Sequence, residues 1–381
     1  MPTQTEMNRV VHIILGAYYL FDEDRIVYGG VQSYFTNLMP LFHCKGFQCK
    51  VYQPDKVNGT VTLPYCELKA YDVSRIRGPE KQSEFILRDI MKTYDDSKDV
   101  LLFSTDALNC KNNVSRSLSV QHGIYWDIPQ HTDYSPHKNA LFSFRKAFNA
   151  YEIIERNNYV KRIVCVDYNF MNWYKAVSAY TAIPMTVIPN FTKIAPICRK
   201  PKEKVSIMFA RRLRRYRGAN LFAESIAPVL NRHPEVELTV AGIGPEEGYM
   251  RKVLEPYKDR VVFTQYKAED SLAIHSDKHI AVVPTIGSEG TSLSLLEAMS
   301  AQCAVICTST GGLSNIVIDE YNGLVVSPTP KSLEDALERL VTSPNYREEL
   351  ARRGFETVKY GFSYEKWKEK WLGVIEEILS E

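Results

Sequence analysis

Two glutamates, Glu289 and Glu297, lie eight positions apart in the segment PTIGSEGTSLSLLEAM at residues 284–299. Glu289 falls in a glycine-containing loop after an apolar strand, at the edge where open α/β sheets bind ligands. Glu297 lies about one and a half turns into the next helix, where its carboxylate could accept a pair of vicinal hydroxyls. The alternative is that Glu289 is a solvated loop acid and that Glu297 occupies an exposed position of the helix. Because Glu297 stands between Leu296 and Ala298 in an otherwise apolar helix, we predict that both acids are functional.

The start of that helix, near Ser292, offers a second kind of chemistry. The first turn of a helix exposes free N–H groups and the positive end of a dipole, so it can hold an anionic group such as a phosphate. Gly290 lets the backbone approach a ligand closely, and Thr291 and Ser292 add hydroxyl donors. The loop therefore predicts a phosphate-binding turn beside the two acids.

The elements that position this loop form a β-α-β unit. An apolar strand ends at Pro284, a loop and a helix follow, and a second apolar strand, AVICTS, leads to the Gly311-Gly312 turn. Similar strands at residues 10–15, 49–53, 100–104, 162–167 and 205–210 alternate with helical segments. This order predicts an α/β fold with parallel sheets. The 381 residues suffice for two such domains.

The same residues carry a family resemblance. E-G-x6-E-A-M, followed by T-x-x-G-G and N-G-L-V-V, resembles the signature of family-4 retaining glycosyltransferases, in which two glutamates flank a nucleotide-sugar site. The resemblance implies a GT-B architecture, two Rossmann-like domains facing a central cleft. Residues 1–190 with a C-terminal helix at about 362–381 would form the acceptor-side domain, residues 191–203 a linker and residues 204–361 the donor-binding domain. Glu289 would hold donor sugar hydroxyls and Glu297 the ribose.

A basic segment opens the second predicted domain, where VSIMFARRLRRYRG holds five arginines within seven residues. Arginines at the carboxyl end of a strand can clamp a diphosphate with bidentate bonds, whereas the alternatives are a solvated loop or a nucleic-acid patch. The family has G-R-L and then Lys-Gly, which Arg212-Leu213 and Arg217-Gly218 match, with Arg211 at the place of the first glycine. We therefore expect Arg212 and Arg217 to stabilise the diphosphate.

Four further residues are predicted to contact the donor. Gly30 lies in a Gly-Gly turn before a helix, where the family has a glycine-rich loop that faces the donor phosphates. Gly242 and Gly244 form a Gly-x-Gly turn after the strand VELTVA, and Glu247 at the third glycine position argues against a nicotinamide site. By the same resemblance, Tyr266 lies where the base-binding loop begins.

His122 ends the predicted strand LSVQ and precedes a glycine. The alternative for a lone histidine is a place in the core, but the family has a histidine at the matching position, near the donor sugar. We therefore expect His122 to contact the sugar. The sequence assigns no role to Asp127, which lies five residues further along the chain.

Residues 139–162 form a basic and aromatic segment. Leu141, Phe144, Phe148 and Tyr151 recur at helical spacing, which predicts a stripe facing the core. The alternative is peripheral membrane contact through the N-terminal domain, since several family members touch membranes with such helices.

Composition narrows the class of protein. The net charge of +2 does not suggest a bulk nucleic-acid binder, and the eight cysteines form no zinc pattern, so we expect a reduced, cytoplasmic protein. The apolar run at residues 10–21 is too short to span a bilayer and predicts a first buried strand. The DED at residues 22–24 has the D-x-D spacing of some metal–nucleotide sites but is expected to be a solvated loop, with no metal or other cofactor required.

Together these features predict a retaining glycosyltransferase that moves a sugar from a nucleoside diphosphate sugar to a hydroxyl of a glycan or lipid-linked acceptor. Surface polysaccharide or glycolipid synthesis is the expected setting. A GT-B epimerase, a phosphorylase with pyridoxal phosphate, or a non-catalytic nucleotide-sugar or glycan-binding subunit are the alternatives. The sequence leaves the sugar, the base and the acceptor open.

Overall fold

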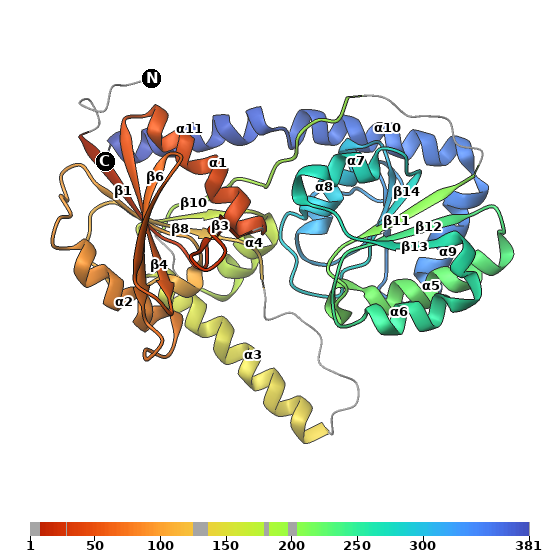
Figure 1. The fold of residues 1–381 in the computed structure, drawn as a ribbon, viewed down its shortest axis with the longest axis horizontal. Helices are drawn as coiled ribbons and strands as arrows, with labels where there is room; N and C mark the ends of the chain where they lie inside the picture. Colours follow the sequence, from red (N-terminus) through yellow and green to blue (C-terminus); the bar gives the residue numbers. More distant parts are fainter. Residues whose placement is uncertain (1–7, 28, 125–135, 179–182, 197–203, 381) are drawn as a thin grey trace. The chain divides into compact units, whose positions relative to one another are not determined.

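The structure, a computed structural model, describes residues 8–27, 29–124, 136–178, 183–196 and 204–380 (Figure 1). Its contacts divide the chain into two units. Unit 1 comprises residues 1–122, 140–188 and 368–381, and unit 2 comprises residues 123–139 and 189–367. The boundary near the C-terminus falls inside α11 (Tyr364–Ser380), so that the chain returns to unit 1 through its last helix.

Unit 1 is built on an eight-stranded sheet in the order β10-β9-β8-β7-β1-β4-β6-β5, in which β5 alone of these strands runs antiparallel to its neighbour. The strands are β1 (Arg9–Ile14), β4 (Phe47–Asp55), β5 (Gly59–Leu63), β6 (Cys66–Asp72), β7 (Val100–Phe103), β8 (Ser117–Gln121), β9 (Arg162–Cys165) and β10 (Met185–Val187). The helices are α1 (Gly30–Cys44), α2 (Pro79–Ile90), α3 (Pro136–Asn157) and α4 (Tyr168–Val177). The order of the strands reverses at β1, between β4 and β7.

Unit 2 has a six-stranded parallel sheet in the order β13-β12-β11-β14-β15-β16. Its strands are β11 (Ser206–Ala210), β12 (Glu237–Ala241), β13 (Val261–Thr264), β14 (Ile280–Val283), β15 (Ala304–Thr308) and β16 (Leu324–Val326). Its helices are α5 (Ala219–Arg232), α6 (Glu247–Leu254), α7 (Ser271–His275), α8 (Leu293–Ser300), α9 (Pro330–Thr342) and α10 (Pro344–Gly361). The order reverses between β11 and β14, which defines the switch point of an open parallel sheet.

The sheet of unit 2 is buried on both faces, and this explains its apolar strands. Alternate residues of β11 enter different cores: Ile207 and Phe209 pack with α5, α6 and α9, whereas Met208 and Ala210 pack with α8. Figure 1 shows α5, α6 and α9 on one side of this sheet and α7 and α8 on the other. The α/β prediction with parallel sheets is confirmed.

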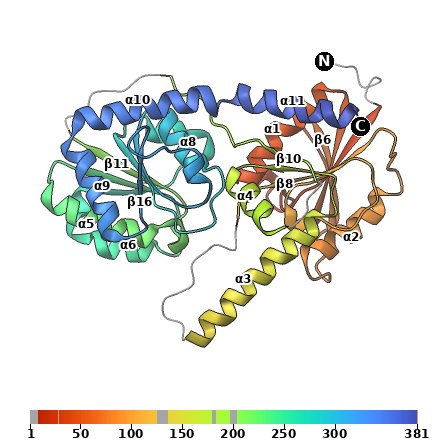
Figure 2. The ribbon, with the colours of Figure 1, turned by 180° about the vertical axis from the view of Figure 1, so that it is seen from behind.

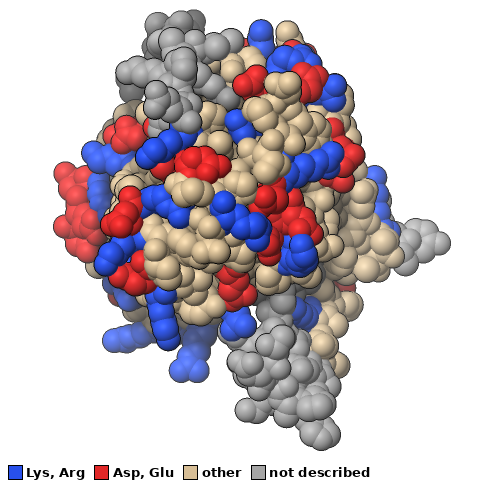
Figure 3. Space-filling model, turned by 90° about the vertical axis from the view of Figure 1, so that its right-hand side faces the viewer, with Lys and Arg blue, Asp and Glu red and all other residues tan. Residues whose placement is uncertain are grey.

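The outer helices of unit 2 are joined by ion pairs. Arg232 of α5 contacts Glu334 and Glu338 of α9 at 2.8 and 2.9 Å, and Arg352 of α10 pairs within its own helix with Glu349. Figure 3 shows the molecule from the right-hand side of Figure 1, and acidic and basic side chains are interspersed over this surface. Such exposed pairs each contribute about 0–1 kcal/mol of stability.

The predicted core stripe of the segment 139–162 is wrong. Leu141, Phe144, Phe148 and Tyr151 are 68%, 71%, 53% and 57% exposed, respectively. Both Figure 1 and Figure 2 show the N-terminal turns of α3 extending beyond the other elements of unit 1. Ile153, near the C-terminal end of α3, is buried. The spacing therefore identified one face of a helix, but among the described residues most of that face is exposed.

The DED segment forms the turn of a short hairpin between β2 (Tyr19–Leu20) and β3 (Arg25–Ile26). Asp22, Glu23 and Asp24 are all exposed. The hydroxyl of Tyr19 donates to Asp24, and Arg25 pairs with Glu23. This turn agrees with the predicted solvated loop.

Candidate active site

The switch point of unit 2 brings two loops together. One loop follows β11 and includes the short helix at Arg215–Arg217; the other follows β14 and leads into α8. The amide of Ile286 donates to the carbonyl oxygen of Tyr216 at 2.8 Å, so the backbones of the two loops are directly linked. This is the edge of an open α/β sheet where ligands bind.

Glu289 occupies the centre of this site. Its carboxylate is buried, and the single oxygen Oε2 accepts hydrogen bonds from Arg211 Nη2 at 2.5 Å, Arg217 Nη1 at 2.7 Å and Thr285 Oγ1 at 2.7 Å. Burial by itself raises the pKa of Glu289, but the positive charges of Arg211 and Arg217 outweigh it and hold the pKa below its ordinary value. Glu289 is therefore an ionised carboxylate fixed by two guanidinium groups.

Close backbone packing explains two glycines around these loops, Gly218 after β11 and Gly311 after β15. Gly218 has a φ of +83°, and a Cβ there would lie 1.9 Å from the carbonyl oxygen of Pro284. Gly311 has a φ of +56°, and its Cβ would lie 2.2 Å from the carbonyl oxygen of Glu289. Any other residue would be strained and would push the loops apart.

Gly242 and Gly244 follow β12, next to β11, and they make room for the arginine loop, residues 211–217. A Cβ on Gly242 would meet the carbonyl oxygen of Arg211 at 1.9 Å, and one on Gly244 that of Leu213 at 2.2 Å. The structure thus gives both glycines a packing role that sets the course of the arginine loop.

The structure places Arg211 in the Glu289 cluster, whereas Arg212 is exposed. Arg217 joins the cluster, as described above. Consecutive residues after a strand point in different directions, so Arg211 turns toward Glu289 and Arg212 toward solvent. Because an exposed guanidinium group can also reach a bound diphosphate, the role of Arg212 stays a prediction. Thr285, which the sequence analysis missed, follows β14 directly, and this place at a strand end was the signal that could have found it.

Glu297 and Tyr266 lie in the same part of unit 2. Glu297 is half-buried on α8, and burial raises its pKa to about 7, although the hydroxyl of Ser271 donates a hydrogen bond to it. Tyr266, in the loop after β13, is half-buried; burial raises its pKa, and the charge of Glu297 adds to this effect. The structure therefore brings the predicted ribose carboxylate and the predicted base-binding tyrosine within electrostatic range of each other.

The N-terminus of α8 completes the site. Ser292 is the residue before the helix, Thr291 and Ser292 are buried, and Gly290 is half-buried. The carbonyl oxygen of Thr291 accepts a 2.8 Å hydrogen bond from Asn190 Nδ2, a residue that the sequence analysis did not select. With no acidic residue in the first turn, this helix end keeps the positive character that suits a phosphate.

The two remaining predicted residues belong to unit 1. His122 follows β8, and its Nε2 lies 3.0 Å from the carbonyl oxygen of Ser104, which accepts, so this nitrogen carries the proton and Nδ1 is free to accept. The ring packs edge-on against Tyr34, and burial lowers the pKa of His122 to about 4. Gly30 is the exposed first residue of α1. Asp127 lies outside the described residues.

Comparison with known proteins gives this site a context. Residues 190–357, almost all of unit 2, match the family described as glycosyl transferases group 1. An uncharacterized glycosyltransferase of Methanocaldococcus jannaschii is 22% identical over 216 residues, which cover 56% of this chain and 55% of that protein. The chain spans about half the length of the curated relatives it matches.

Solved structures share the fold over nearly the whole chain. A sucrose-phosphate synthase from Thermosynechococcus elongatus has a TM-score of 0.75 at 16% identity, covering 98% of this chain and 100% of that one. The Anabaena protein HepE, solved in complex with UDP-glucose, has a TM-score of 0.70 at 11% identity, with 97% and 99% covered. These likenesses confirm the GT-B fold class.

Proposed function

Because residues 190–357 match the family of group 1 glycosyl transferases, we propose that this protein moves a sugar from a nucleoside diphosphate sugar to a hydroxyl of a glycan or lipid-linked acceptor. The observation that carries the proposal is the buried Glu289 held by Arg211 and Arg217 at the switch point of unit 2. The test is release of nucleoside diphosphate from a panel of UDP-, GDP- and ADP-sugars, and its loss in the Glu289 variant considered in the Discussion.

Unit 2 would bind the donor through three contacts. Arg217, Arg211 and the N-terminus of α8 supply positive charge for the diphosphate, which suits the planar, multiple N–H donors of guanidinium groups. Glu297 would accept the ribose hydroxyls, with Tyr266 beside the base. Glu289 would accept hydroxyls of the transferred sugar. His122 has a neutral Nδ1 that can accept a hydrogen bond, and its contact with the sugar stays a prediction.

We propose that the reaction retains the anomeric configuration, because neither candidate base is suited to deprotonate an acceptor at neutral pH. Two guanidinium groups already occupy Glu289 Oε2 and hold its pKa below the ordinary value. The pKa of His122 is lowered to about 4 by burial. An inverting enzyme needs a base poised near the working pH. In the retaining scheme the departing phosphate oxygen takes the proton, and the arginines neutralise its charge without a metal ion.

Donor affinity should depend on the protonation of Glu297. Its pKa of about 7 reflects burial, and only the ionised carboxylate can accept both ribose hydroxyls. The donor therefore binds the deprotonated form, and we expect its dissociation constant to be constant above about pH 7.5 and to rise about tenfold per unit well below pH 7. Isothermal titration calorimetry with the nucleoside diphosphate across this range measures the effect.

Glu297→Gln is the matched control for that titration. The variant should bind the donor about 10- to 100-fold more weakly, since a hydrogen bond to a charged group contributes about 1.5–3 kcal/mol, and the pH dependence should disappear. A donor affinity that keeps the same pH profile in Glu297→Gln would contradict the ribose assignment.

The exposed stripe of α3 supports a finer proposal about the acceptor: unit 1 makes peripheral contact with an anionic membrane surface, where a lipid-linked acceptor would be found. Leu141, Phe144 and Phe148 offer large apolar side chains, and Arg145 and Lys146 lie between them along the helix. Amphipathic helices with this composition bind the interface of bilayers. Among the described residues, no helix combines the length and apolarity needed to cross a membrane.

Phe144→Glu should weaken binding to vesicles that contain phosphatidylglycerol by about tenfold or more, because insertion of an exposed phenylalanine is worth about 1.5–3 kcal/mol. Co-sedimentation measures this, with Tyr360→Glu, at an equally exposed aromatic of α10, as the control. Equal binding by the wild type and Phe144→Glu, or equal loss in Tyr360→Glu, would contradict the membrane contact.

A further inference from the structure

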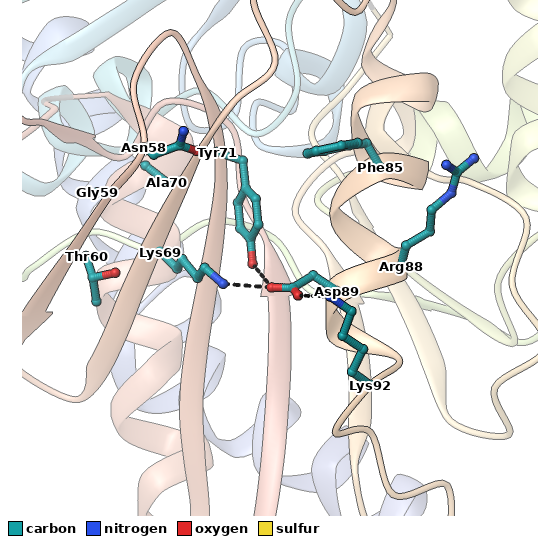
Figure 4. A pocket seen from close by; sticks show the side chains of 10 residues that line it. All are labelled: Asn58, Gly59, Thr60, Lys69, Ala70, Tyr71, Phe85, Arg88, Asp89 and Lys92. Atoms are coloured by element: carbon teal, nitrogen blue, oxygen red, sulfur yellow. Dashed lines mark hydrogen bonds and ion pairs between the residues drawn. The ribbon is translucent and has the colours of Figure 1, made fainter.

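A cavity of about 600 Å³ lies at the edge of the unit 1 sheet, between the β5–β6 hairpin and α2 (Figure 4). Its volume falls in the range of pockets that bind small ligands. None of its lining residues belongs to the Glu289 cluster or contacts His122, and the strand-order reversal of this sheet lies at β1 rather than here. The donor chemistry described above therefore leaves this cavity without a role.

One carboxylate organises the cavity. Asp89 of α2 accepts hydrogen bonds from Lys69 Nζ at 2.7 Å, Tyr71 Oη at 2.6 Å and Lys92 Nζ at 3.0 Å. Figure 4 shows Lys69 and Tyr71 of β6 and Lys92, which follows α2, converging on it. The hydrogen bonds from Lys69, Tyr71 and Lys92 lower the pKa of Asp89 well below its ordinary value, so it stays ionised and holds both lysines in place.

The cavity carries a net positive charge. Lys69, Arg88 and Lys92 contribute three positive charges and Asp89 one negative charge, which leaves +2. Arg88 is exposed, and none of the ion pairs found among the described residues involves it. A guanidinium group in this state can bind a carboxylate, sulfate or phosphate through two parallel N–H groups.

An aromatic surface adjoins these charges. Phe85 of α2 lines the cavity and is 43% exposed, which is unusual for a phenylalanine within a helix that packs on a sheet. The ring of Tyr71 lies edge-on to it with centroids 6.4 Å apart. Thr60 and Asn58 add exposed polar groups on the hairpin side. A flat apolar face beside a cluster of cations and hydrogen-bonding groups matches a sugar ring that bears a negative charge.

We propose that this cavity binds an acidic saccharide, with Arg88 and Lys92 on its anionic group and Phe85 against the sugar ring. None of its lining residues belongs to the donor site of unit 2, and it would hold a charged part of a glycan. The proposal does not depend on the transfer reaction, because all of its residues lie in unit 1 and binding is measured without turnover.

The experiment measures saccharide binding to the full chain by isothermal titration calorimetry, with UDP present in excess to occupy any donor site. The probes are oligomers of galacturonate, glucuronate and sulfated galactose. The controls are the methyl ester of the galacturonate oligomer, which is its uncharged counterpart, and inorganic phosphate. We expect at least one acidic oligomer to bind, its uncharged counterpart to bind at least tenfold more weakly, and Arg88→Glu to raise its dissociation constant at least about tenfold. Arg77→Glu, the same charge change in the exposed loop before α2, should leave binding within about twofold.

Five outcomes would overturn the proposal. Three concern the ligands: no acidic oligomer binds, the methyl ester binds equally well, or phosphate binds as tightly as the oligomers. Two concern the variants: binding is unchanged in Arg88→Glu, or Arg77→Glu causes an equal loss, which would show unspecific attraction. Arg88 is exposed, so its substitution should leave the thermal unfolding temperature unchanged. Phe85→Ala gives a second test, because it removes the ring that is proposed to contact the sugar.

Discussion

Glu289→Gln is expected to lower kcat for sugar transfer by about 10²- to 10³-fold, the loss typical when one charge-stabilising group is removed from an active site. The transition state of glycosyl transfer carries positive charge on the sugar ring. Glutamine keeps the shape of Glu289 but loses the negative charge and accepts fewer hydrogen bonds. Steady-state kinetics with a saturating donor measures the effect.

The same variant should separate chemistry from binding. In Glu289→Gln the guanidinium groups of Arg211 and Arg217 lose their carboxylate partner, so their attraction for the diphosphate should not weaken. We therefore expect the dissociation constant of the nucleoside diphosphate to stay the same or fall while kcat drops. A kcat within threefold of the wild type would show that Glu289 is only a structural partner of the arginines.

Arg211→Met should cost about 3–5 kcal/mol of stability, the usual result of removing one partner of a buried ion pair. The side chains of Arg211 and Glu289 are both almost fully buried, and Arg211 also donates to Thr285. Methionine fills much of the same volume but leaves Glu289 with Arg217 and Thr285 as its partners. For a domain the size of unit 2, this loss corresponds to a fall of roughly 6–20 °C in Tm.

Arg212→Met is the matched control for that measurement. It removes the same charge one residue away, but from an exposed position, so we expect a change within about 0.5 kcal/mol. Differential scanning calorimetry of the full chain compares the two variants. Equal shifts of Tm would contradict the burial of Arg211 in the cluster.

Much of the fold and part of the site follow from local sequence patterns. Apolar runs such as residues 279–284 and 304–309, each followed by a glycine turn, are typical of parallel strands buried on both faces, and β14 and β15 lie there. The helix predicted from Ser292 begins at Leu293. Glu297 was selected because a carboxylate in an apolar helix costs free energy unless it has a specific partner. Glu289 was selected because it lies in the loop after a strand, at the edge where open α/β sheets bind ligands.

Other features depend on contacts between distant parts of the chain, which a local pattern does not contain. The helical spacing of Leu141 and Phe144 predicts an apolar face, but not whether an element covers it. The burial of Arg211 beside Glu289 depends on the course of the loop after β11, which Gly242 and Gly244 set from another strand. The cavity at Asp89 joins a hairpin to a helix 20 residues further along the chain.

The central claim is retaining transfer from a donor held by unit 2, and the configuration of the product tests it most directly. The measurement is time-resolved proton NMR of the reaction with an α-linked nucleoside diphosphate sugar, read from the anomeric coupling constant of the newly formed linkage. Because neither Glu289 nor His122 is suited to deprotonate the acceptor, attack should come from the side of the leaving group, and we predict an α-linkage. A β-linkage from the same donor would contradict the mechanism and the role given to Glu289.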